Sequence, residues 1–152
     1  MTIETTIRGG RWRSALPSAD RWAVRIHREA CVRAPALNGS VALLLADDAA
    51  LQALNRRFRG RAAPTNVLSF PSGASAPDFL GDIAVSYETC DREAREKGAS
   101  FADHAAHLVV HGLLHLAGFD HENDRDALAM EALEAEILGA LGVADPYAGV
   151  EI

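Results

Sequence analysis

Residues 111–121 read HGLLHLAGFDH, and this stretch decides how the fold around it is interpreted. It places His111, His115 and His121 at offsets 0, 4 and 10, with Gly118 at offset 7. Histidines four positions apart lie on one face of a helix, about one turn from each other. Gly118 lacks a Cβ and readily adopts a left-handed conformation, which ends the helix and returns the chain toward its last turn. The spacing therefore predicts three imidazoles that converge on one metal ion.

The ligand set predicted by this motif is typical of a catalytic zinc site. Three neutral imidazoles leave the fourth position of a tetrahedral zinc ion open to water, and the pKa of such a water falls to about 7. A structural zinc ion usually has four protein ligands, often cysteines, and Cys31 and Cys90 are both distant in the sequence. We expect one Zn²⁺ per chain on His111, His115 and His121, with His111 among the catalytic residues.

Two further histidines, His104 and His107, precede the motif on the same predicted helix. At about 100° per residue they project within about 80° of His111 and His115, so one helix face carries a column of imidazoles. Three roles stay open for His104 and His107: partners of the metal ligands, substrate contacts, or histidines that pack in the core.

Position 112 limits the reactions that the motif can support. The motif resembles that of the metzincin zinc proteases, except that Gly112 stands where they have a glutamate. That glutamate is the general base of peptide hydrolysis, so its absence disfavours a protease, although a metzincin-like zinc hydrolase of other substrates stays an alternative. A phosphodiester fits better, because a metal ion also offsets the charge that develops on phosphoryl oxygens.

A cluster of arginines lies upstream of the histidines. It comprises Arg56, Arg57, Arg59 and Arg61. Arg59 is the first candidate for holding a phosphate, since a guanidinium can bind phosphate through two hydrogen bonds and keeps its charge. Its neighbours support this role, because Phe58 is expected to anchor the loop and Gly60 follows directly. The other three arginines are candidate substrate contacts, or they complement the dipole at a helix C-terminus.

Composition indicates one ordinary globular domain over residues 1–152, with 49% hydrophobic residues and a net charge of −6. The charge is split, since residues 1–75 carry +6 and residues 76–152 carry −12. The split favours a basic face that could contact phosphates, although helices that differ only in surface composition would produce it too.

The two cysteines lack a C-x-x-C motif, and no apolar run is long enough to span a membrane. We therefore expect reduced thiols and a cytoplasmic protein.

Apolar periodicity predicts about four short strands and about five helices. The strands are expected at residues 3–7, 41–46, 67–70 and 82–87. The helices are expected at residues 18–34, 48–58 and 88–97, from a cap at Ser100 or Asp103 to residue 117, and from 124 onward. The last has an apolar stripe that comprises Leu128, Leu133, Ile137 and Leu138. The interspersed order predicts an α+β fold with a mixed sheet, and it places the zinc site at the end of a helix in the C-terminal half.

Four segments resemble, in order and spacing, the YbeY family of bacterial endoribonucleases. They are residues 54–59 (LNRRFR), 64–71 (PTNVLSFP), 81–83 (GDI) and 111–121. The resemblance implies a zinc-dependent endoribonuclease that cuts single-stranded RNA, acts in 16S rRNA 3′-end maturation and contributes to ribosome quality control. It implies the same three zinc ligands and makes Arg59 the functionally important arginine. The implied partners are single-stranded RNA, the small ribosomal subunit and its assembly factors, with neither a membrane nor DNA.

Three points leave alternatives open beside this resemblance. Phe58 and Phe119 stand where tyrosine is common in the family, so a role for those hydroxyls is not carried over. No residue stands out as a general base; Asp82 is a candidate, or else a turn residue at a strand end. A non-enzymatic alternative is a metal-stabilised assembly factor that docks on the ribosome through its basic face, with little catalysis.

Overall fold

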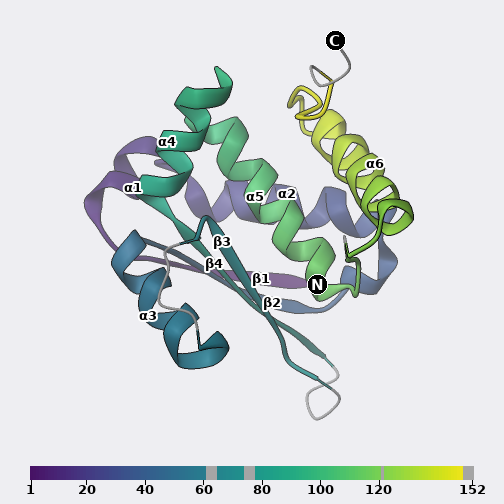
Figure 1. Ribbon diagram of the computed structural model, residues 1–152, viewed down its shortest axis with the longest axis horizontal. Coiled ribbons are helices and arrows are strands. Elements are labelled where there is room, and N and C mark those ends of the chain that lie inside the picture. Colours follow the sequence, from purple (N-terminus) through teal and green to yellow (C-terminus); the bar gives the residue numbers. More distant parts are fainter. Residues whose placement is uncertain (61–64, 74–77, 121, 149–152) are drawn as a thin grey trace.

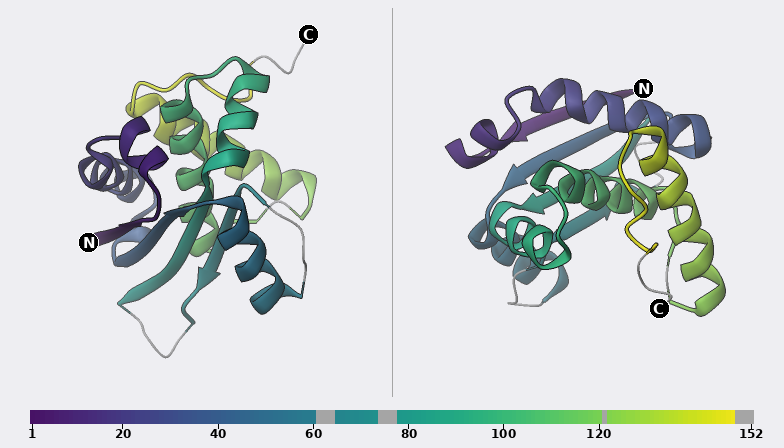
Figure 2. Two further views of the ribbon diagram at one scale, coloured as in Figure 1. Left: turned by 90° about the vertical axis from the view of Figure 1, so that its left-hand side faces the viewer. Right: turned by 90° about the horizontal axis from the view of Figure 1, so that it is seen from above.

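Helices cover both faces of one four-stranded sheet (Figure 1, Figure 2). The computed structural model describes residues 1–60, 65–73, 78–120 and 122–148. Within them the strands are β1 (Thr2–Ile7), β2 (Ser40–Ala46), β3 (Val67–Pro71) and β4 (Phe79–Ser86). The helices are α1 (Gly10–Ala15), α2 (Ala19–Arg33), α3 (Asp48–Arg59), α4 (Tyr87–Lys97), α5 (Phe101–Leu116) and α6 (Asp124–Ala140), with a 3₁₀ turn η1 at Pro35–Leu37. None of these described helices is long and apolar enough to cross a bilayer.

The sheet is mixed, as the sequence predicts. Its strand order is β1-β2-β4-β3, in which β1, β2 and β4 run parallel and β3 runs antiparallel to β4. The connection from β1 to β2 passes through α2, since parallel neighbours cannot be joined by a hairpin. β3 is an edge strand, with Ser69 opposite Ile83. This arrangement confirms the predicted α+β fold.

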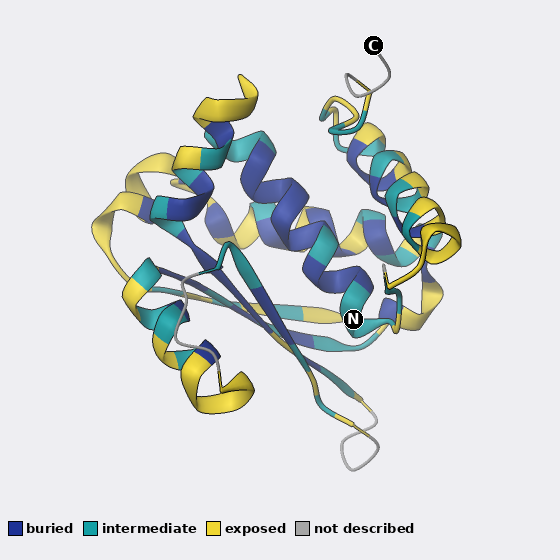
Figure 3. Cartoon of the chain, in the orientation of Figure 1, coloured by how far each residue is buried: buried dark blue, intermediate teal, exposed yellow. Residues whose placement is uncertain are grey.

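The main core lies between the sheet and the helices α2, α5 and α6. Side chains alternate along β2, so Val41, Leu43 and Leu45 face this core and are at most 2% exposed. A smaller core lies on the opposite face of the sheet, where Leu51 of α3 packs with Leu68 of β3. Figure 3 shows that α5 is buried along most of its length, whereas α3 exposes much of its surface. The buried helix α5 is therefore a rigid support for the histidines that it carries.

The sequence patterns do not predict α1, so the described part of the chain has six α-helices rather than about five. The helix is held by Trp12, which is 1% exposed and donates from Nε1 to the Ala46 carbonyl at 2.7 Å. Trp12 also lies edge-on to Tyr87 and Phe101. A helix of six residues spans less than two turns, so its apolar residues establish no period. Burial of one aromatic side chain, and not a repeating pattern, fixes α1.

Gly112 brings α5 into close contact with the sheet. A Cβ at this position would lie 2.9 Å from Ile83 Cγ2 and 3.1 Å from Ser69 Oγ. The Ser69 hydroxyl also donates to the Gly112 carbonyl at 3.1 Å. Position 112 therefore faces the sheet and leaves no room for the glutamate of the zinc proteases.

We expect Gly112→Ala to lower the free energy of unfolding by roughly 1–3 kcal/mol, because overpacking a core contact forces neighbours to shift. The neighbour is Ile83, a β-branched residue that is 0% exposed and whose Cγ2 would have to shift. Gly139→Ala in α6 is the matched control, since a Cβ there meets nothing within 4 Å. Alanine favours helix over glycine, so the control should be as stable as the wild type or more stable. Urea denaturation of the two variants checks this, and equal stability would contradict the close contact.

Candidate metal and phosphate site

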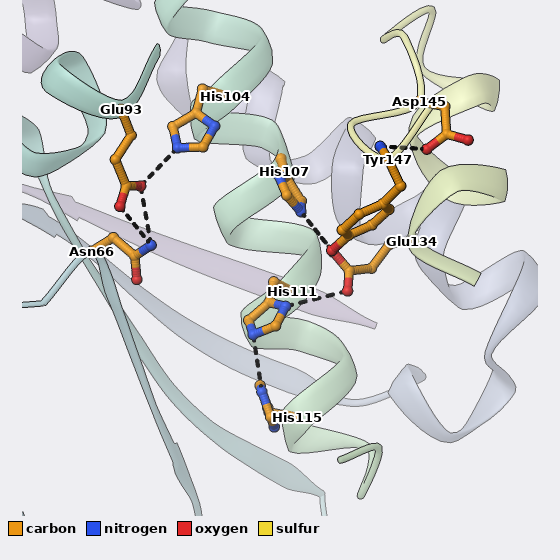
Figure 4. A network of polar contacts seen from close by, with 9 residues as sticks. All are labelled: Asn66, Glu93, His104, His107, His111, His115, Glu134, Asp145 and Tyr147. Atoms are coloured by element: carbon orange, nitrogen blue, oxygen red, sulfur yellow. Dashed lines mark hydrogen bonds and ion pairs between the residues drawn. The ribbon is translucent and has the colours of Figure 1, made fainter. Parts of the chain in front are cut away.

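Four histidines form a continuous column along α5 (Figure 4). The ring centroids of neighbouring members lie 5.8 Å apart for His104 and His107, 6.5 Å for His107 and His111, and 4.6 Å for His111 and His115. α5 ends just before Gly118, whose φ of 94° is in the left-handed region. The predicted column and the predicted helix end are both confirmed. His121, the third predicted zinc ligand, lies outside the described residues.

His111 and His115 present their Nε2 atoms to each other at 3.0 Å. Two nitrogen ligands that each lie 2.0–2.1 Å from a tetrahedral zinc ion are roughly 3.3 Å apart. The observed separation therefore fits two imidazoles that share one ion. Within the part of the chain that the structure describes, no group of three histidine, cysteine or acidic side chains could hold a metal. A complete site would thus need a ligand such as His121.

A buried carboxylate, Glu134 of α6, lies behind the histidines and is 1% exposed. Its Oε1 accepts from His111 Nδ1 at 3.2 Å. Its Oε2 accepts from His107 Nε2 at 2.7 Å and from the Tyr147 hydroxyl at 3.1 Å. When His111 carries its proton on Nδ1, the lone pair is on Nε2, the nitrogen that points toward His115. A histidine that binds a metal through Nε2 requires this tautomer.

The charge state of this network follows from its contacts. Burial by itself raises the pKa of Glu134, but the hydrogen bonds from His107 and His111 outweigh burial and lower that pKa to about 2. Burial, together with the negative charge of Glu134, raises the pKa of the Tyr147 phenol. At neutral pH Glu134 is therefore a carboxylate and Tyr147 is a protonated donor.

His104 belongs to a second network that supports the strand β3. Its Nε2 donates to Glu93 Oε1 at 2.9 Å, and the Asn66 side-chain amide donates to the same carboxylate at 3.1 Å. The Asn66 side-chain oxygen accepts from the backbone N–H of Val67 at 2.7 Å. Burial lowers the pKa of His104 despite the nearby Glu93, so this histidine is neutral. Of the roles left open, His104 has a structural one, whereas His107 contacts the partner of a predicted ligand.

Arg59 is the last residue of α3 and is held against the edge strand β3. Its Nη2 donates to the Ser69 carbonyl at 2.8 Å, and its guanidinium carbon lies 5.6 Å from the centre of the Phe70 ring. The helix ends at Gly60, which has a φ of 69°. Phe58, which the sequence predicts to anchor the loop, is 58% exposed. The anchor is β3, because the carbonyl of an edge strand accepts the guanidinium.

One cleft of about 330 Å³ brings the predicted residues together. Its described lining comprises Arg59, Asn66, Val67, Ser69, Pro71, His111 and His115. Arg56 and Arg57 are exposed on α3 and do not line it, and Arg61 lies outside the described residues. The candidate base Asp82 lines a different groove on the α3 face of the sheet. Asp82 is on the other side of the sheet because side chains alternate along β4, so that Asp82 and Ile83 point to opposite faces.

Sequence reasoning missed Glu134 and Tyr147. A signal for Glu134 exists, because it lies four residues after Met130 and three before Ile137, and both of those are at most 1% exposed. A charged residue on the buried face of a helix is rare unless it is paired. Leu128, assigned to the apolar stripe, is 69% exposed, so the true stripe is rotated from the predicted one.

The mixed sheet, with a histidine column and an arginine lining one cleft at its edge, defines an α+β protein whose candidate site combines imidazoles with a guanidinium. A family model described as Endoribonuclease YbeY matches residues 15–142 of the chain. The chain belongs to the YbeY family, as the four resembling segments imply.

Individual relatives agree with the family assignment. The Endoribonuclease YbeY of Chelativorans sp. (strain BNC1) is 47% identical over 156 residues, which cover 97% of this chain and 93% of the relative. That of Sphingopyxis alaskensis is 56% identical over 119 residues, covering 71% of each chain. A solution structure of TM1509 from Thermotoga maritima has a TM-score of 0.59 and 26% identity, covering 93% of this chain and 92% of that one.

Proposed function

We propose that this protein is a zinc-dependent endoribonuclease that cuts single-stranded RNA, with zinc on His111, His115 and His121. The observation that supports it most is the single cleft shared by Arg59, His111 and His115. A guanidinium beside imidazoles suits a phosphodiester, because the guanidinium neutralises the phosphate while the imidazoles hold a cation. The relatives named Endoribonuclease YbeY support RNA as the substrate.

The residues of the chain divide the work of such a reaction. Arg59 binds the phosphate and is prepositioned by the Ser69 carbonyl, so little side-chain entropy is lost on binding. Glu134 orients His111 through Nδ1 and is a positioning residue. Zinc, when bound, supplies an activated water near neutral pH and positive charge beside the phosphoryl oxygens.

Peptide hydrolysis is disfavoured on two grounds. Gly112 provides no general base, and the sheet behind it excludes a longer side chain. The cleft also carries the positive charge of Arg59, which suits an anionic ester better than a neutral peptide bond.

Arg59→Ala tests the phosphate contact. We expect kcat/KM on a single-stranded RNA to fall about 10²-fold, the size of effect seen when one donor to a developing anion is removed. The slope of the logarithm of RNA affinity against the logarithm of salt concentration should become shallower by about one, because one phosphate contact is lost. Zinc content should not change, because Arg59 contacts β3 and not the histidines. Arg21→Ala, an exposed arginine on α2, is the matched control.

The cellular role that we propose is 16S rRNA 3′-end maturation on the small ribosomal subunit. The Arg59→Ala variant also separates this role from non-enzymatic docking. If catalysis matters, the variant should accumulate unprocessed 16S precursor while the protein stays folded. If the variant leaves the ribosome but purified wild-type protein with zinc cuts no RNA, the protein is a docking factor and the proposed activity is wrong.

A further inference from the structure

One aromatic side chain stands apart from all the others in the chain. All nine aromatic residues lie in the described part, and only Phe58 is exposed, at 58%. A single exposed hydrophobic residue needs no explanation by itself. Phe58, however, directly precedes Arg59, the residue that lines the cleft with the histidines. The position of this phenyl ring, more than its exposure, therefore suggests a ligand.

Phe58 continues a row of flat groups that begins in the cleft. The Arg59 guanidinium carbon lies 5.6 Å from the centre of the Phe70 ring, and the Phe70 and Phe58 ring centroids lie 5.4 Å apart. The guanidinium carbon of Arg57 lies 5.2 Å from the centre of the Phe58 ring. Two aromatic rings are thus flanked by two cations.

The row crosses the edge strand β3 from one face of the sheet to the other. Successive side chains of a strand point to opposite faces, so Ser69 faces the cleft side and Phe70 faces the α3 side. On the α3 side Phe58 and Phe70 line a groove of about 430 Å³ with Leu54, and one cation, Arg8, and one acid, Asp82, also line it. Because β3 is the edge, no further described strand covers this crossing point.

We propose that Phe58 and Phe70 form a stacking site for one unpaired base of an RNA whose neighbouring phosphate lies at Arg59. The inference rests on the proposed function and names the substrate feature that the site would select. The charge pattern favours a nucleotide over an apolar peptide, because cations flank both rings and a nucleotide combines an anion with an aromatic face. A base in a duplex is already stacked and paired, so a platform of this kind selects single strands.

The test measures RNA binding without cleavage. Metal-free protein in chelator is titrated with a fluorescent single-stranded RNA, and then with copies in which one abasic nucleotide replaces each position in turn. We expect Phe58→Ala to weaken binding about tenfold, the scale of one base stacked on an aromatic side chain. One abasic position should weaken wild-type binding by a similar factor and should have no further effect in Phe58→Ala.

Two further variants separate stacking from other causes. Phe58→Tyr keeps the aromatic face and should bind within about twofold of the wild type, since stacking tolerates the hydroxyl. Leu128→Ala removes an apolar side chain that is 69% exposed on α6, and it should have no effect. Both Phe58 variants should melt close to the wild type, because the side chain contributes little to the core.

Each contrary result has a defined meaning. Wild-type affinity in Phe58→Ala, additive losses from the variant and the abasic RNA, or no RNA binding by metal-free wild type would each overturn the stacking site. Unchanged affinity for free RNA with lost binding to ribosomal particles would instead make Phe58 a protein contact. If the zinc-loaded wild type cuts no RNA, the proposed function fails, whereas the binding titration still decides the stacking site.

Discussion

His115→Ala should abolish stoichiometric zinc binding and lower RNA cleavage by about 10³-fold or more, because a metal ion supplies several kcal/mol of transition-state stabilisation. The Nε2 atoms of His115 and His111 are 3.0 Å apart, so the substitution removes one of the two predicted ligands that the structure describes. Metal analysis of the purified protein and single-turnover cleavage of a single-stranded RNA measure the two effects.

The expected loss is specific to the metal and not to the fold. His115 is only half-buried and lies at the last turn of α5, so the metal-free variant should melt near the metal-free wild type. Zinc should raise the melting temperature of the wild type and leave that of the variant unchanged. A variant that still binds one zinc per chain and cuts RNA at the wild-type rate would remove His115 from the site.

Glu134→Gln should weaken zinc binding about 10–100-fold, the usual effect of removing a partner that orients a metal-binding histidine. The glutamine side chain has one accepting oxygen where the carboxylate has two. Its NH₂ group is a donor, and it would face the N–H donor of His107 or His111 without forming a hydrogen bond. Competition with a chelator of known affinity measures the change. Glu136→Gln is the matched control, because its side chain lies on the same helix and is 65% exposed.

The same substitution changes how stability depends on pH in metal-free protein. The pKa of Glu134 falls from its ordinary value of 4.5 to about 2 in the folded state, with burial opposing the hydrogen bonds from the two histidines that lower it. A depressed pKa adds stability that is present above pH 4.5 and is lost as the pH falls to 2. The free energy of unfolding of the wild type should therefore exceed that of Glu134→Gln by roughly 3 kcal/mol at pH 7, and the two values should converge near pH 2. A constant difference across this range would contradict an ionised Glu134.

The sequence predicts the features that depend on local periodicity. The histidine column and the helix end at Gly118 follow from spacing along one helix, and the structure has both. The net charge of −6 gives no hint of the proposed phosphate site, because it averages a basic and an acidic half. Arg59 comes from the basic half and His111 from the acidic one, and the cleft joins them.

The missed features depend on contacts between distant segments. Glu134 reaches the histidines only because α6 packs across α5, and no pattern within α6 says which helix it meets. The sequence predicts that Phe58 anchors the loop, yet the structure leaves the ring 58% exposed and holds Arg59 through the Ser69 carbonyl of β3. Asp82 fails as a base for the same kind of reason, since the pleat of β4 turns it away from the cleft.

The contacts of Glu134 couple the C-terminal helix α6 thermodynamically to the proposed zinc site. Glu134 and Tyr147 lie after the last predicted ligand, yet they hold the orientation of the first one. Any free energy that an ion gains from a correctly oriented His111 is shared with the docking of α6 on α5, because linkage acts in both directions. Under the proposed function, zinc binding therefore favours the protein in which α6 is docked on α5 and Tyr147 contacts Glu134. Occupancy of the proposed zinc site would thus report completion of folding as well as readiness for chemistry.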